Sequence, residues 1–98
     1  MRYLFVSEYT TEDIYWDIVN EISVQSQEEV TKVLENRTTS RIFEIEILNI
    51  ITHGKTASVN GIFKLEDNNI YSFCNVYTFV SAGKNKVKEI TSYVIKMD

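Results

Sequence analysis

The sequence of 98 residues contains no proline, three glycines, one cysteine and one histidine. The single cysteine, Cys74, excludes a disulfide within the chain. The single histidine, His53, has no Cys or His partner for a zinc site, and no Ser-His-Asp or Cys-His arrangement is readable. The three glycines are too widely spaced for a phosphate-binding loop. We therefore expect neither a metal nor a cofactor.

Positive charge is also scarce, with 10 Lys and Arg against 14 Asp and Glu and a net charge of −4. Because nucleic-acid-binding domains normally present a basic face, we do not expect a nucleic-acid partner. No apolar run reaches the roughly 20 residues of a membrane span. The apolar start Met1–Val6 is too short for a secretion signal. These features predict a cytoplasmic protein that does not cross a membrane.

The hydrophobic content of 44% and the aromatic content of 12% are typical of a folded globular chain. The length fits a single domain over residues 1–98. A domain of this size buries roughly 60–70% of the surface of its unfolded chain, so its core is modest. A partner subunit would therefore add stability.

The C-terminal half predicts four consecutive strands joined by short turns. The runs are rich in β-branched and aromatic residues, and Gly, Asn and Asp clusters separate them, which is typical of β-hairpins. The predicted strands cover residues 41–53, 56–65, 70–80 and 86–96. We expect an antiparallel meander, with a bend or bulge in the long first strand.

The N-terminal half predicts a strand followed by a helix. Ile14–Val19 has a β-like composition, and Ile22–Val24 extends it past an irregular point at Asn20. Thr10–Asp13 fits a helix cap or a turn, and Met1–Val6 fits either a strand or a helix.

Ser26 and Glu29 form a capping-box pattern that predicts a helix start. Val30, Val33 and Leu34 share one face of this helix, which is expected to end within 36–40. The expected order is strand, helix and four strands.

Both faces of the predicted sheet carry apolar side chains. On the strand 70–80, one alternating set is aromatic, with Tyr71, Phe73, Tyr77 and Phe79 beside Asn75. The opposite set is also largely apolar, and one short helix cannot cover both faces. The surplus face predicts a homodimer that packs sheet to sheet.

Three motifs resemble the nuclear transport factor 2-like (NTF2-like) superfamily, which includes the SnoaL-like polyketide cyclases and the ketosteroid isomerases. They are the tryptophan strand Ile14–Val19 leading into the helix, the segment Ile50–Gly61, and Tyr71–Phe79 with Ile90–Val94. The resemblance covers about residues 12–97.

The resemblance implies a cystatin-like α+β cone, in which a curved, mostly antiparallel sheet surrounds a pocket and a helix packs on its concave face. Members commonly dimerise through the sheet. The two roof helices with which members usually begin have no counterpart before Glu12. The pocket would then be partly open, covered by a partner subunit, or vestigial.

The resemblance also implies two candidate catalytic residues. Asp17 matches the general base of the ketosteroid isomerases, and Asn75 matches their hydrogen-bond donor to the oxyanion. The family's tyrosine donor comes from the first long helix, which this chain lacks. The alternatives, which we favour, are an exposed strand carboxylate at Asp17 and a cavity-lining amide at Asn75.

A set of aromatic, apolar and polar side chains is expected to line the pocket: Tyr15, Trp16, Phe73, Asn75, Tyr77, Ile90 and Ser92. Such a set fits a small-molecule site, and it fits an ordinary core equally well. Our leading hypothesis is a non-catalytic domain that binds a small apolar molecule, forms a homodimer, or both. The alternatives are an isomerase or cyclase using Asp17 and Asn75, and a purely structural dimer.

The remaining conspicuous residues have plainer interpretations. Cys74 lies mid-strand and is expected to be a small buried thiol. His53 precedes a turn and is expected at the surface. Glu44 and Glu46 point the same way from one strand, which favours a solvated face.

Overall fold

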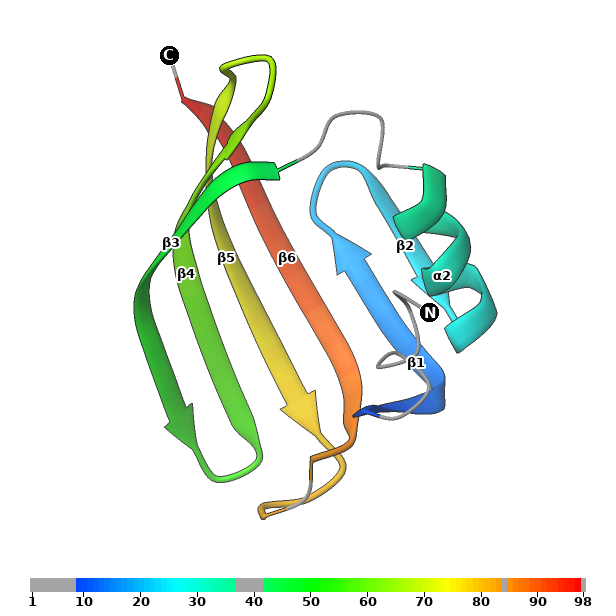
Figure 1. Cartoon of the computed structure of the whole chain (residues 1–98). Coiled ribbons are helices and arrows are strands. Elements are labelled where there is room, and N and C mark those ends of the chain that lie inside the picture. The colour runs from blue at the N-terminus through cyan, green and yellow to red at the C-terminus, as the bar shows by residue number, and fades with distance from the viewer. Residues whose placement is uncertain (1–8, 37–41, 84, 98) are drawn as a thin grey trace.

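The computed structural model describes residues 9–36, 42–83 and 85–97, which form one sheet and one helix (Figure 1). The strands are β1 (Thr10–Ile18), β2 (Ile22–Gln25), β3 (Ile42–His53), β4 (Thr56–Leu65), β5 (Ile70–Phe79) and β6 (Val87–Met97), and the helix is α2 (Gln27–Asn36). The expectations for Met1–Val6 and for the helix end beyond Asn36 lie outside the described residues.

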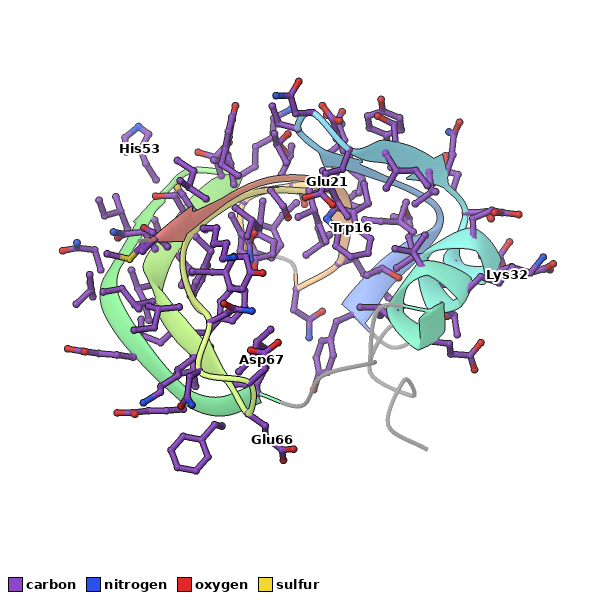
Figure 2. The ribbon with its side chains drawn as sticks, turned by 90° about the horizontal axis from the view of Figure 1, so that it is seen from above. Trp16, Glu21, Lys32, His53, Glu66 and Asp67 are labelled. Atoms are coloured by element: carbon purple, nitrogen blue, oxygen red, sulfur yellow. The ribbon has the colours of Figure 1, made fainter. Side chains whose placement is uncertain are left out.

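The six strands pair in the order β2-β1-β6-β5-β4-β3. The meander from β3 to β6 is antiparallel, as predicted, whereas β1 pairs with β6 in parallel. The sheet curves strongly, and Figure 2 shows Trp16 inside the curve, with His53 and Lys32 pointing outward. The predicted α+β class, a curved and mostly antiparallel sheet with one helix, is confirmed.

The segment around Asn20 differs from the prediction, because it reverses the chain instead of extending one strand. Asn20 has a φ of 70°, and the backbone N–H of Glu21 donates to the carbonyl of Ile18 at 2.9 Å. Asparagine tolerates this left-handed conformation better than most residues, so it can close a hairpin. β2 therefore lies beside β1, and the sheet has one strand more than expected.

Thr10–Asp13 was expected to be a helix cap or a turn, and this prediction is wrong. The segment is the first half of β1, and Thr10 pairs with Val87 of β6. The pairing partner is far away in the sequence, so local residue preferences do not reveal it.

Ser26 caps α2, as its sequence pattern predicted. Its Oγ accepts a hydrogen bond from the backbone N–H of Glu29 at 3.2 Å. The reciprocal bond of a full capping box is replaced, because the N–H of Ser26 donates to the carbonyl of Ile14 at 2.8 Å. Ser26 therefore joins the helix start to β1.

Replacing Ser26 by alanine is expected to lower the free energy of unfolding by about 1 kcal/mol, because one helix N–H loses its acceptor. Ser26→Gly should cost less, since Ser26 has a φ of 90°, which glycine adopts without strain. Urea unfolding followed by far-UV circular dichroism checks both values. Equal midpoints for wild type and Ser26→Ala would contradict the capping role.

The hydrophobic core lies between α2 and the sheet, on the concave face. Ile14, Val30 and Val87 are its buried centre. The partly buried residues around it come from both the sheet and the helix: Trp16, Val24, Leu34, Tyr77, Phe79 and Ile90. α2 packs mainly against β1 and β2, so it covers the side of the concave face that these two strands form.

The long strand β3 contains the expected irregularity, with register shifts between Ile42 and Glu44 and between Ile47 and Asn49. The second shift lies next to the buried Gly61 of β4. A side chain at Gly61 would overlap the backbone carbonyl of Glu46. The missing Cβ of Gly61 thus lets β3 approach β4 closely where the sheet bends.

Candidate functional site on the concave face

The strand register decides which predicted pocket residues share a face. Residues directly opposite each other on neighbouring strands point to the same side of a sheet. Trp16 pairs with Ile90, Ile90 with Tyr77, and Asn75 with Ser92. Phe73 alternates with these β5 residues in the same set. The concave face therefore brings together six of the predicted residues: Trp16, Phe73, Asn75, Tyr77, Ile90 and Ser92.

Trp16 and Ser92 form a hydrogen-bonded pair between β1 and β6. The indole Nε1–H of Trp16 donates to the Oγ of Ser92 at 2.9 Å. Ser92 is only 5% exposed, so its hydroxyl is held inside the protein. Trp16 remains partly exposed inside the curve of the sheet (Figure 2).

Asn75 and Tyr77 form a second polar pair on β5. The amide Nδ2 of Asn75 lies 3.2 Å from the hydroxyl oxygen of Tyr77, and both side chains are half-buried. Since Asn75 is the cross-strand partner of Ser92, the two polar pairs lie side by side on β5 and β6.

An aromatic cluster continues the concave face from Phe73 toward β4. The rings of Phe63 and Tyr71 are stacked with centroids 5.1 Å apart, and Phe63 lies 5.9 Å from Phe73. Phe63 was not among the residues predicted to line the pocket. Phe63 could have been predicted only from its pairing with Tyr71 across the hairpin, because that pairing depends on the strand register and not on composition.

Tyr15 and Asp17 lie on the other, convex face, because successive strand residues point to opposite sides. Tyr15 pairs with Glu89 and Gln25, and it is 39% exposed. The expectation that Tyr15 joins Trp16 in the pocket is therefore corrected.

The register also separates the two catalytic candidates. Asp17 lies opposite Ser23, whose hydroxyl donates to the Oδ1 of Asp17 at 2.8 Å. Asn75 lies on the concave face, so the structure does not bring Asp17 and Asn75 together.

The convex face carries a shallow, open hollow of about 220 Å³. Residues of β4, β5 and β6 line it, with Phe73 contributing from the strand between its neighbours: Asn60, Ser72, Phe73, Cys74, Tyr93 and Ile95. Cys74 is a free thiol that is half-buried in this hollow, so it is more accessible than the buried thiol expected from the sequence. Val76, Tyr93 and Ile95 are exposed around it.

The surface positions expected for His53, Glu44 and Glu46 are confirmed, because all three residues are exposed. Within the described ranges, no group of three or more His, Cys, Asp and Glu side chains could hold a metal ion. No helix among the described residues is both long enough and apolar enough to span a bilayer.

No protein-family model matches the sequence, and no curated protein matches it. Solved structures do match it. An NTF2-like protein of unknown function from Cytophaga hutchinsonii is 21% identical, with 93% of this chain and 83% of that chain covered and a TM-score of 0.70. The chain has the NTF2-like fold.

Two further structural neighbours are named for different activities. An LEH-like epoxide hydrolase from M. tuberculosis is 14% identical, with 95% of this chain and 70% of that chain covered and a TM-score of 0.72. A Mesorhizobium loti protein assigned as a SnoaL-like polyketide cyclase is 12% identical, with 90% and 80% covered and a TM-score of 0.74. At these identities the NTF2-like fold is what the proteins share, and function has to be argued from the site.

Proposed function

We propose that this NTF2-like domain binds a small, largely apolar molecule on its concave face and does not transform it. The observation that carries the proposal is the pair of hydrogen-bonded groups, Trp16 with Ser92 and Asn75 with Tyr77, set in an aromatic wall. Small-molecule sites are typically apolar and aromatic surfaces with a few well-placed polar groups.

The concave face differs from a filled core in its exposure. Ile14, Val30 and Val87 are buried beneath α2, as core residues should be. Trp16 and Tyr77 lie beside them and stay partly exposed. Large aromatic side chains left accessible on an inward-curving surface favour contact with a ligand over packing alone.

The chemistry of the wall favours binding over catalysis. Its polar groups are an indole, an amide and two hydroxyls, whereas the carboxylates of Asp17 and Glu89 lie on the convex face by register. A general base must lie within hydrogen-bond reach of the proton that it removes. An isomerase or cyclase using Asp17 with Asn75 would need both groups on one face, so binding is the better-supported function.

Binding is testable with the neutral apolar dye N-phenyl-1-naphthylamine. Trp16 is the only tryptophan in the sequence, so energy transfer from it reports dye bound to the chain, and the two variants below distinguish the faces. We expect saturable binding of one dye per chain. Asn75→Asp should weaken binding by about tenfold or more, because it places a charge in an apolar site.

Ser72→Asp is the matched control, since Ser72 is a half-buried polar residue of the same strand that lines the convex hollow. It should leave dye binding unchanged. Loss of binding in Ser72→Asp with none in Asn75→Asp would place the dye in the convex hollow and contradict the proposal.

We also propose that the convex face forms a homodimer interface. Tyr93 and Ile95 are large apolar side chains that are 46% and 67% exposed, and they border the hollow on that face. A second copy packed against them would bury this surface and enlarge a core that is small for one chain. A purely structural dimer would use the same interface without a ligand.

A further inference from the structure

We infer that the molecule bound on the concave face carries a neutral carbonyl oxygen, which accepts a hydrogen bond from the hydroxyl of Ser92. The inference rests on the proposed binding function and adds the chemical class of the ligand. The evidence is the number of hydrogen-bond donors that the two polar pairs leave unused.

The direction of the Trp16–Ser92 hydrogen bond is fixed by chemistry. An indole N–H can only donate, so the oxygen of Ser92 must be the acceptor in this 2.9 Å contact. The hydroxyl hydrogen of Ser92 is then left to be donated elsewhere. Among the described residues, the hydrogen bonds give that hydrogen no acceptor.

The burial of Ser92 makes this unused donor significant. A buried polar group is normally satisfied by the protein or by an ordered water. With 5% of its surface exposed, Ser92 has little access to bulk solvent. A ligand oxygen at this position would satisfy the hydroxyl and could replace a water there.

The neighbouring pair adds a second donor whichever way its amide is oriented. If the Nδ2 of Asn75 donates to Tyr77, the phenol hydrogen of Tyr77 remains to be donated. If the amide is reversed, the phenol donates to Asn75 and the amide NH₂ remains to be donated. Asn75 lies directly opposite Ser92, so this second pair is on the neighbouring strand, which is about 5 Å away across the sheet.

The surroundings of Ser92 favour a neutral acceptor over a carboxylate. Its neighbours by register are Asn75 on β5 and Ile18 on β1, and neither is a cation. Lys96 shares the concave face but lies farther along β6, opposite Tyr71. Because burying a carboxylate without a cation is costly, a ketone, an ester or a lactone is the acceptor that fits.

Two probes of nearly the same shape test the inference. In 2-acetylnaphthalene a C=O group occupies the place of the C=CH₂ group of 2-isopropenylnaphthalene. Competition with N-phenyl-1-naphthylamine gives both affinities from one readout. In Ser92→Ala, the preference for the ketone over the alkene should fall about 5- to 10-fold relative to wild type, which is the effect of one hydrogen bond.

Ser72→Ala on the convex face is the control and should leave the preference unchanged. If Ser92→Ala does not fold, Ser92→Cys has nearly the same size and a much weaker donor, and it should lower the preference in the same direction.

An unchanged preference in the Ser92 variant would overturn the carbonyl inference while leaving the binding site intact. Tighter binding of 2-naphthoate than of the ketone would also overturn it, in favour of an anion. Failure of the dye itself to bind would instead refute the proposed function, so the two failures are distinguishable.

Discussion

Replacing Gly61 by alanine should lower the free energy of unfolding by about 3 kcal/mol, near the upper end of the usual cost of overpacking a core. A Cβ at this position would overlap the backbone carbonyl of Glu46 and lie 3.1 Å from the ring of Phe73. A flexible side chain could move aside, but a backbone carbonyl paired in a sheet cannot do so without shifting the strand. β3 would have to separate from β4 at the bend that shapes the concave face.

Urea unfolding followed by circular dichroism measures this loss, and Gly54→Ala is the control. Gly54 has a φ of 59°, but no atom lies within 4 Å of the position that a Cβ would occupy there. Alanine at Gly54 therefore suffers only backbone strain of about 1 kcal/mol. A loss in Gly61→Ala no larger than that in Gly54→Ala would show that β3 does not depend on the close approach.

Replacing Ile95 by glutamate is expected to weaken the proposed homodimer more than about 100-fold, because each of the two copies would bury a carboxylate in the interface. Ile95 is 67% exposed in the single chain, so the substitution should leave the monomer folded. Sedimentation velocity over a range of micromolar concentrations reports the dimer fraction, and the thermal melting curve of a dilute sample reports the fold.

Ile50→Glu is a closely matched control for the dimer. Ile50 is also 67% exposed, but it lies on β3, and its pairing with Val59 places it on the concave side. It should leave the dimer intact. A wild-type chain that stays monomeric at tens of micromolar would refute the dimer, and dissociation by Ile50→Glu alone would move the interface to β3.

The sequence predicted the C-terminal meander well because each strand pairs with the next one along the chain. The turn clusters at Gly54 and Asp67–Asn69 set the strand ends, and local residue preferences were sufficient there. The N-terminal part was harder, because β1 pairs with β6 in parallel. That contact depends on the whole sheet and leaves no local signature.

The sequence predicted only part of the candidate site, because the site also depends on the register between distant strands. Alternation within β5 placed Phe73, Asn75 and Tyr77 together, and the structure agrees. The choice between Tyr15 and Trp16 depended on how β1 is registered against β6, since a shift of one residue exchanges the two faces. The hydrogen-bonded pairing of Trp16 with Ser92 likewise arises only once the sheet has formed.

The most direct test is a titration of ¹⁵N-labelled protein with 2-acetylnaphthalene, followed by NMR of the side-chain N–H groups. The indole of Trp16 and the amide of Asn75 report the concave face, whereas the amide of Asn60 reports the convex hollow. We predict that the signals of Trp16 and Asn75 move in a saturable manner while that of Asn60 stays in place. Movement of the Asn60 signal alone, with Trp16 and Asn75 unaffected, would contradict a binding site on the concave face.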